Sequence, residues 1–186
     1  MTQKDVFWAA VGVPGFEHLA LEVSPSGISA DGLVLRQHDG RALRLRYTMH
    51  LDPEWRPVEL AMESLTDASR LHLRSDGNGR WLDDLGAGRS HVRGCIDVDI
   101  MATPFTNTPA IKRLGLGPGQ SREIRALFVR IPDLGIQVHR QRYTCLEATA
   151  TGARYRYENL ESGFWADLDL DAEGLVNAYS GVWQRA

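Results

Sequence analysis

Apolar and polar residues alternate along much of the chain. In residues 43–49, Leu43, Leu45 and Met49 share one face of an extended segment, with arginines on the other face. Alternation with a period of two is typical of strands with one buried and one solvated face. The pattern recurs in residues 70–74, 154–158 and 164–171, and further strands are predicted at 17–24, 27–36, 54–65, 121–131 and 136–147.

Turn sequences separate these predicted strands. Residues 75–80, SDGNGR, contain both Asp-Gly and Asn-Gly. These pairs indicate a hairpin, because their residues tolerate positive φ. No linker, low-complexity tract or internal repeat divides the 186 residues. A chain of this length buries roughly 70% of its unfolded surface in a core, so we expect one all-β domain over residues 1–186.

The polar faces of two predicted strands carry opposite charges. Arg154 and Arg156 alternate with tyrosines, whereas Asp167, Asp169 and Asp171 alternate with leucines. If these strands are neighbours, each cross-strand Arg–Asp pair would contribute about 0.2–1 kcal/mol. Such a ladder favours a solvated sheet surface over a site for an anionic ligand.

The composition argues against some classes of partner. A formal net charge of −3 at pH 7 does not favour nucleic acid or an anionic membrane surface. Cys95 and Cys145 lie far apart without metal-ligand spacing, so we expect two reduced thiols. Residues 1–16 lack the order of a signal peptide, and no apolar run is long enough for a membrane span. We therefore expect a cytoplasmic protein.

The segment CIDVDIMATPFTNTPAIKRL, residues 95–114, is the strongest candidate for chemistry. Asp97 and Asp99 share one face of a predicted strand, about 7 Å apart along it. This spacing could serve a divalent cation or an acid–base pair. The signal is weak, because Asp-x-Asp recurs at 167–171 and no third ligand follows. We predict no catalytic residue, no metal and no cofactor.

A short helix is predicted directly after this strand. Thr106, Asn107 and Thr108 are residue types that cap a helix N-terminus. Pro109 suits the first turn, where its missing N–H costs nothing, and Gly115 is expected to end the helix. So short a helix is marginal alone in water, so the surrounding sheet must hold it by packing.

Two basic residues, Lys112 and Arg113, lie near the C-terminus of this helix, where its dipole favours positive charge. A sheet wrapped around the helix would place one of them in partly buried surroundings, and a buried charge needs a hydrogen-bonded partner. Asp97 and Asp99 are the nearest candidates. We favour this structural ion pair over catalysis as the reason for the two acids.

The chain is similar to a bacterial family described as "putative glycolipid-binding" and formerly catalogued as a domain of unknown function. The signature of that family matches residues 95–114. The other matching features are Trp8, the hairpin before Trp81, QRY at 141–143, YRYE at 155–158, FWADLDLDAEGLV at 164–176 and Tyr-x-x-x-Trp at 179–183. The chain departs from the family at Pro109-Ala110, where members carry Leu-Pro, at Lys112, where Arg is usual, and at Ser180, where Pro is usual. The first departure shifts the expected helix start by one residue.

The resemblance implies a mainly β fold, a spiral β-roll in which one long, mostly antiparallel sheet wraps around a single short α-helix. It also implies a homodimer and, by likeness of shape to lipid carriers, a lipid or glycolipid ligand. The candidate ligand-binding or motif residues are Asp97, Asp99, Thr106, Asn107, Thr108, Arg113, Arg142, Tyr155 and Trp165.

Three functions are compatible with these residues. A non-catalytic lipid- or glycolipid-binding protein is favoured, with about 0.8 kcal/mol gained per buried methylene, although aromatic residues more often fill a core. A cytoplasmic interaction module acting as a homodimer is the alternative. A hydrolase of a sugar derivative using Asp97 and Asp99 is less favoured, because no hydrolase motif is present. His72 and His139 are expected on solvated strand faces rather than as general bases.

Overall fold

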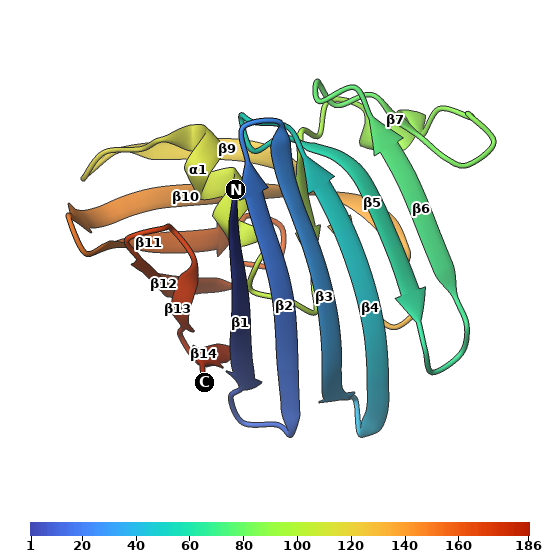
Figure 1. Cartoon of the computed structure of the whole chain (residues 1–186), viewed down its shortest axis with the longest axis horizontal. Coiled ribbons are helices and arrows are strands. Elements are labelled where there is room, and N and C mark those ends of the chain that lie inside the picture. Colours follow the sequence, from blue (N-terminus) through green and yellow to red (C-terminus); the bar gives the residue numbers. More distant parts are fainter.

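The alternating segments form a fourteen-stranded sheet in the computed structural model, which describes all residues from 1 to 186 (Figure 1). The strands are β1 (Thr2–Ala10), β2 (Gly15–Ser24), β3 (Gly27–His38), β4 (Arg41–Leu51), β5 (Pro57–Ser64), β6 (Arg70–Ser75), β7 (Trp81–Leu82), β8 (Asp97–Ile100), β9 (Ser121–Val129), β10 (Ile136–Thr149), β11 (Gly152–Asn159), β12 (Trp165–Asp171), β13 (Val176–Tyr179) and β14 (Trp183–Arg185). A short 3₁₀-helix, η1 (Ser90–Val92), and one α-helix, α1 (Asn107–Leu114), complete the fold.

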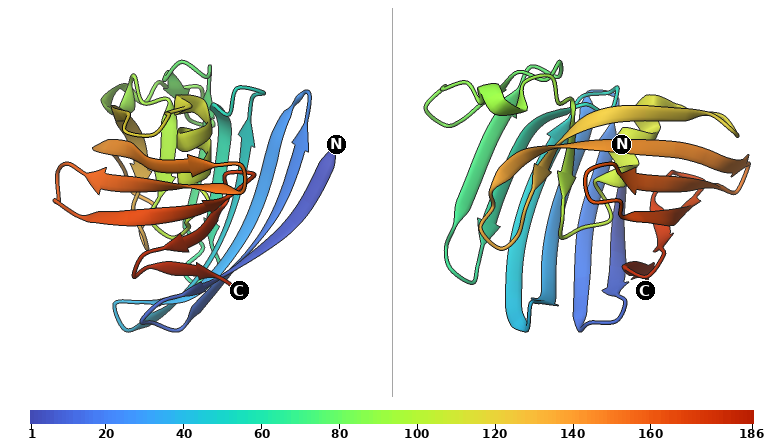
Figure 2. Two further views of the ribbon diagram at one scale, coloured as in Figure 1. Left: turned by 90° about the vertical axis from the view of Figure 1, so that its left-hand side faces the viewer. Right: turned by 180° about the vertical axis from the view of Figure 1, so that it is seen from behind.

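The order of the strands divides the sheet into two halves. It runs β7-β6-β5-β4-β3-β2-β1-β14-β13-β12-β11-β10-β9-β8. The two ends of the chain therefore meet in the middle of the sheet, where β1 pairs with both β2 and β14. The strands of the C-terminal half run across those of the N-terminal half, so that the sheet curls over itself (Figure 2). This arrangement confirms the predicted spiral β-roll around one helix.

The α-helix forms the connection between the last two strands of the sheet, which are parallel. All neighbours in the sheet pair antiparallel except β8 and β9, which pair parallel from Asp97↔Ala126 to Ile100↔Val129. Parallel neighbours need a crossover connection, which is usually helical. Here α1 supplies it, and five of its eight residues, Asn107–Ile111, are buried inside the roll.

The ends of α1 confirm one expectation and correct another. Gly115 adopts the left-handed conformation, with φ of 56°, and its N–H bonds to the Ile111 carbonyl oxygen, so glycine ends the helix as predicted. Thr106 occupies the N-cap position, but its hydroxyl makes no capping hydrogen bond. That hydroxyl instead bonds to Asp99 and to the Ile100 N–H of the preceding strand. The contact with β8 therefore replaces the expected cap.

The interior contains two hydrophobic clusters. The larger one joins the inner face of the N-terminal half to β8 and β9 and includes the fully buried Trp8, Trp81 and Trp183. The smaller one packs Ala110 and Ile111 of the helix against tyrosines and leucines of β10–β12. Both cysteines are buried and free, as the sequence predicted.

The outer face of the C-terminal half carries the predicted ladder of opposite charges. β11 pairs with β12, and Arg156 binds Asp167 at 2.9 Å. Arg154 reaches Asp167 at 3.0 Å and Asp169 at 3.6 Å. These arginines are half exposed, so each pair contributes little to stability. The charge ladder is therefore part of the solvated surface of the sheet.

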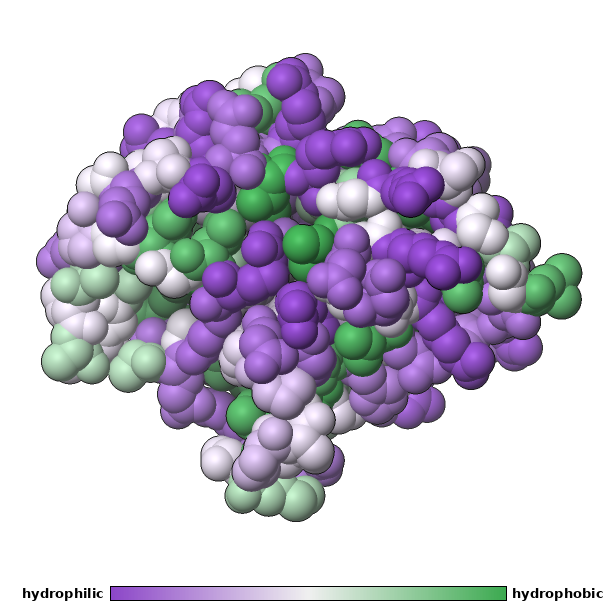
Figure 3. Space-filling model, turned by 90° about the horizontal axis from the view of Figure 1, so that it is seen from above, coloured by the Kyte–Doolittle hydropathy of each residue, from purple (hydrophilic) through white to green (hydrophobic).

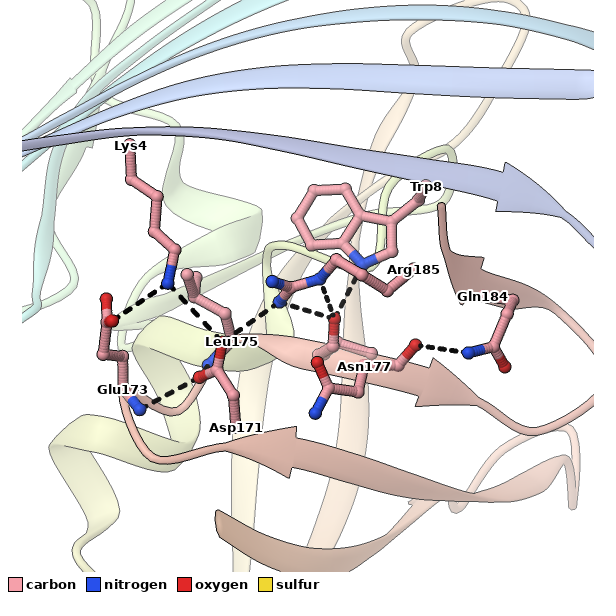
Figure 4. A network of polar contacts seen from close by, with 9 residues as sticks. Lys4, Trp8, Asp171, Glu173, Leu175, Asn177, Gln184 and Arg185 are labelled. Atoms are coloured by element: carbon pink, nitrogen blue, oxygen red, sulfur yellow. Dashed lines mark hydrogen bonds and ion pairs between the residues drawn. The ribbon is translucent and has the colours of Figure 1, made fainter. Parts of the chain in front are cut away.

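Side-chain contacts join the two halves where β1 meets β13 and β14 (Figure 4). The Val176 carbonyl oxygen accepts hydrogen bonds from Trp8 Nε1 at 2.7 Å and from Arg185 Nη2 at 2.9 Å. Asp171 lies 3.3 Å from Arg185 and 3.8 Å from Lys4. We call these five residues the junction network.

The structure also corrects the predicted strand boundaries. The strand expected at 54–65 begins only at Pro57, because residues 52–56 form a turn in which Trp55 has φ of 64°. Four strands, β1, β7, β13 and β14, were not predicted as such, and three of them are four residues long or shorter. No helix is long and apolar enough to cross a membrane.

Candidate functional site: a cavity between the two halves of the sheet

The curl of the sheet forms a cavity of about 370 Å³ that is open to solvent on one side, which we call the central cavity. β3 contributes one wall, β8–β11 another, and β13 and β14 close it at the centre of the sheet. Its aromatic lining residues are Phe128, Tyr157, Phe164, Tyr179 and Trp183. Its polar lining residues include Arg36, His38, Asp99, Thr103, His139 and Asn159. The cavity is thus apolar in area with a few convergent polar groups, as in most ligand sites.

Three aromatic rings form a group on one side of the cavity. Tyr157 lies edge-on to Tyr179, with ring centroids 6.2 Å apart. Phe164 lies 6.3 Å from Tyr157 and 6.4 Å from Tyr179. Phe164 is half exposed, whereas Tyr157 is buried. The group therefore extends from the interior to the surface and offers rigid apolar faces along that path.

Asp99 is the acid of the signature that faces this cavity. Its Oδ2 accepts hydrogen bonds from Gln141 Nε2 at 2.5 Å and from Tyr157 Oη at 3.3 Å, and its Oδ1 accepts one from Thr106 Oγ1 at 3.4 Å. Burial raises the pKa of the carboxyl group above its ordinary value, and these donors oppose that rise. Three hydrogen bonds therefore hold Asp99 in a fixed orientation.

His139 lies in the same cavity, so the prediction of a solvated face was wrong. Its ring stacks on Phe128 with centroids 3.9 Å apart, and burial lowers its pKa. The Asn159 side-chain oxygen accepts two backbone N–H groups, which turns its amide nitrogen toward His139 Nδ1 at 2.9 Å. Nδ1 then accepts a hydrogen bond from the Asn159 amide, and Nε2 lies 2.7 Å from the side-chain amide nitrogen of Gln137.

Two donors on the opposite side of the cavity have no partner. Arg36 Nε and Trp183 Nε1 are buried without a hydrogen bond. The guanidinium of Arg36 lies 5.2 Å from the centroid of the Trp183 ring. The two other fully buried tryptophans both donate, Trp8 to Val176 O and Trp81 to Cys95 O, each at 2.7 Å. Trp183 is therefore an exception within this chain.

A buried acid, Glu17, lies behind this wall. Its Oε1 accepts hydrogen bonds from Tyr47 Oη and Thr103 Oγ1, both at 2.6 Å, while its Oε2 has no partner. Burial raises the pKa of Glu17 to about 8, against smaller opposing effects of these donors and of Arg36. The carboxyl group is therefore mainly neutral at pH 7.

Asp97, the other acid of the signature, pairs with the helix. Arg113 donates from Nε at 2.9 Å and from Nη2 at 2.6 Å to the two carboxylate oxygens. The side chain of Asp97 is 3% exposed and that of Arg113 is 21% exposed. This is the ion pair that the sequence predicted, with Arg113 as the base. Asp97 and Asp99 thus have separate partners, and only Asp99 lines the central cavity.

The other candidate residues have diverse surroundings. Asn107 accepts a hydrogen bond from Tyr143 at 2.9 Å, and Thr108 is buried with its hydroxyl unpartnered. Tyr155 donates to the Leu116 carbonyl oxygen at 2.9 Å, and burial raises its pKa to about 12. Two further candidates are on the outer face, Arg142 beside Glu123 and Trp165 beneath Arg156. None of these lines the central cavity.

Sequence reasoning missed several residues of the cavity. His139 has the same parity on β10 as Tyr143 and Cys145, and both of these are buried. Glu17 likewise shares the face of Leu19 and Leu21 on β2. This parity was a usable signal for an inward polar group. Lys112, whose role was open, lies over the Trp55 ring at 5.3 Å and links the helix to the N-terminal half.

The structure contains no group of three or more histidine, cysteine, aspartate or glutamate side chains placed to hold a metal ion. The polar groups of the central cavity are one carboxylate, one arginine, two histidines and several neutral donors. What this arrangement can do is donate and accept hydrogen bonds beside aromatic faces.

A match to a family model decides which family the chain belongs to. The model of the family described as "Putative glycolipid-binding" matches residues 5–185. The chain belongs to this family. Among solved structures, the chain is similar to a DUF1089 family protein from Pseudomonas aeruginosa, determined by crystallography at 1.80 Å. The two are 39% identical, 92% of each chain is covered, and the TM-score is 0.79. No curated protein matches it significantly.

Proposed function

We propose that the protein binds a lipid or glycolipid, without catalysis, in the central cavity. The observation that carries this proposal is the aromatic group of Tyr157, Phe164 and Tyr179 beside the fixed polar side chains of Asp99 and Asn159. Aromatic faces pack against the C–H faces of a sugar or against methylenes, while the carboxylate and amide groups bond to hydroxyls. The family description supports the same class of ligand.

The size of the cavity limits which part of the ligand it encloses. Ligand pockets typically measure about 300–1,000 Å³, so 370 Å³ holds a head group and the first methylenes. About five buried methylenes would contribute about 4 kcal/mol before the costs of binding. The half-exposed Phe164 marks the side at which a longer chain would leave.

Titration with n-octyl β-D-glucoside tests this proposal directly. This probe carries a sugar and a short alkyl chain, and tryptophan fluorescence or calorimetry reports its binding. We expect Phe164→Ala and Asp99→Asn to weaken binding by about tenfold or more, because each removes a buried or charge-assisted contact. Native mass spectrometry of protein from its own host, followed by organic extraction, would identify the natural ligand.

A matched control is Phe16→Ala, which removes an exposed phenylalanine from the outer face of β2. It should leave the affinity unchanged. If Phe16→Ala and Phe164→Ala weaken octyl glucoside equally, or if the wild-type protein binds none, the cavity is not the ligand site.

A second observation favours self-association as a homodimer. On the outer face of β1–β3, Phe7 pairs with His18, which in turn pairs with Leu33, and Phe16 pairs with Leu35. The four apolar side chains are all exposed, from 39% to 62%. Seen from above, by contrast, hydrophobic residues are interrupted by hydrophilic groups (Figure 3). An exposed apolar sheet face of this kind is typical of an interface, and we propose a second copy of the chain as its partner.

The oligomeric state of a Phe16→Glu variant tests this interface. In a twofold dimer each substitution would be buried twice without a partner, so we expect a monomer by light scattering. Leu85→Glu, at an exposed leucine in the β7–η1 loop, is the control and should leave the dimer intact. A wild-type monomer at micromolar concentration would contradict the proposal.

The two free, buried thiols fit a reducing compartment, and we propose the cytoplasm.

A further inference from the structure

A positive charge and two buried hydrogen-bond donors that nothing in the protein uses belong to residues that line the central cavity. Arg36 Nε and Trp183 Nε1 are both buried and unpartnered, although both residues line the cavity. Trp183 is only 1% exposed. A buried donor without an acceptor destabilises the fold, unless another molecule supplies the acceptor.

The charge of Arg36 is also uncompensated. Many arginines of this chain form an ion pair with a carboxylate, as Arg154 and Arg156 do, but Arg36 has no such partner within the protein. Glu17 is the one acid that acts on it, and burial keeps Glu17 mainly neutral at pH 7. The face of the Trp183 ring attracts the guanidinium without occupying its N–H groups.

We propose that Arg36 and Trp183 bind an anionic group, a phosphate or a carboxylate, carried by the amphipathic ligand. This inference rests on the proposed function and specifies its ligand class as an acidic lipid or glycolipid. The anion accepts from Arg36 and from Trp183 Nε1–H, and a sugar or hydroxyl group extends toward Asp99 and Asn159 on the other walls. Thr103 and His38 line the same side and add further polar contacts.

The geometry suits this division of the cavity. Asp99 and Arg36 come from different halves of the sheet, on β8 and β3, so the anion and the sugar or hydroxyl group would contact different walls of the cavity. Charge-assisted hydrogen bonds inside a partly apolar cavity are stronger than neutral ones. The anionic head group therefore gives specificity, and the aromatic group of Tyr157, Phe164 and Tyr179 gives apolar contact.

The test compares n-octyl phosphate, n-octyl β-D-glucoside and inorganic phosphate by calorimetry on the full chain. We expect octyl phosphate to bind about tenfold or more tightly than octyl glucoside, since it adds charge-assisted bonds to Arg36. Arg36→Gln should abolish this preference and leave octyl glucoside unchanged. Trp183→Phe, which keeps an aromatic ring and removes the N–H, should reduce it by a few-fold. Arg44→Gln, at an exposed arginine on β4, is the charge-matched control.

The outcomes separate the inference from the function on which it rests. If octyl glucoside binds and octyl phosphate is no tighter, or if Arg36→Gln keeps the preference, the anion site is wrong and the lipid function stands. If neither amphiphile binds but inorganic phosphate does, and Arg36→Gln abolishes this, the anion site stands and the lipid function is wrong. If none of the three binds, both are wrong.

The stability of Arg36→Gln gives a further readout. A structural arginine paired with Glu17 would lower the melting temperature when removed. An unsatisfied cation kept for a ligand should leave the melting temperature of the empty protein equal or higher, because its desolvation cost disappears. A lowered melting temperature together with unchanged octyl phosphate affinity would overturn the proposal.

Discussion

Glu17 is a fully buried carboxyl group whose two best contacts are with hydroxyls of Tyr47 and Thr103 rather than with a cation. Its pKa is about 8 in the folded chain, against an ordinary value of 4.5. Between these values the folded protein retains a proton that the unfolded chain releases. The contribution of Glu17 to stability is therefore full below about pH 4.5 and is lost as the pH rises to about 8.

The variant Glu17→Gln tests this pH dependence. Glutamine keeps the acceptor oxygen but cannot ionise, so we expect it to be the more stable protein at pH 8.5, by on the order of 4 kcal/mol. Urea unfolding at pH 5.5 and pH 8.5 measures the difference. Glu22→Gln, on the same strand and partly exposed, is the control. A wild-type slope between the two pH values that Glu17→Gln does not change would show that Glu17 is ionised in the fold.

At the residue scale, the sequence predicted which faces are buried better than which polar groups they contain. Glu17 and His139 lie on the same strand face as buried neighbours. In the sequence, however, a titratable residue at the end of an alternating run can equally mean that the buried face has ended. The free donors of Arg36 and Trp183 could not be predicted at all, because an unsatisfied group is defined by distant strands.

At the element scale, the α1 helix shows how one ion pair can be read from sequence. The prediction combined a helix too short to stand alone with two acids on the strand before it, and the structure pairs Asp97 with Arg113. The cap was predicted wrongly, because Thr106 was assigned by residue type while its hydroxyl is used by β8. Local propensity was overruled by a tertiary contact.

The Asp97–Arg113 pair is tested by a double-mutant cycle. Asp97→Ala leaves the partly buried guanidinium of Arg113 without its partner, and we expect a loss of about 3 kcal/mol in the free energy of unfolding. The double variant Asp97→Ala/Arg113→Ala should lose less than the sum of the single variants. The exposed pair Asp31–Arg46 is the control, with an expected coupling of about 0.2–1 kcal/mol. If Asp97→Ala and Asp99→Ala both leave the melting temperature unchanged, the acids are not structural.

At the scale of the whole molecule, the fold class followed from alternation and turns, whereas the closure of the roll did not. Each strand pairs with the next one along the chain, which local patterns indicate, except that β7 and β8 lie at opposite ends of the sheet and do not pair. Two features of the sheet are not indicated by local patterns: the parallel direction of the β8–β9 pair, and the pairing of β1 with β14, which joins residues near the two termini. The second pairing brings Trp183 beside Arg36 and so creates the cavity.

The join between the halves is narrow, which makes the junction network important. β1 and β14 share three register pairs, from Trp8↔Arg185 to Ala10↔Trp183, and β13 and β14 share two, whereas β1 and β2 share eight. The side chains of Trp8 and Arg185 both bind the Val176 carbonyl oxygen and so reinforce the short ladder (Figure 4). We therefore expect the amides of β13 and β14 to be the least protected from hydrogen exchange in the middle of the sheet.

Arg185→Gln tests this expectation by hydrogen exchange. It removes the bonds of the guanidinium to Val176 and Asp171, so local opening of residues 176–186 should become about tenfold more frequent. Amides of β3 and β4 should exchange at the wild-type rate, because their long ladder does not depend on the junction. Arg44→Gln, which lies on β4 away from the junction, should change neither region. An equal increase across all strands would mean that the two halves open as one cooperative unit, and that the junction network does not act locally to hold the roll closed.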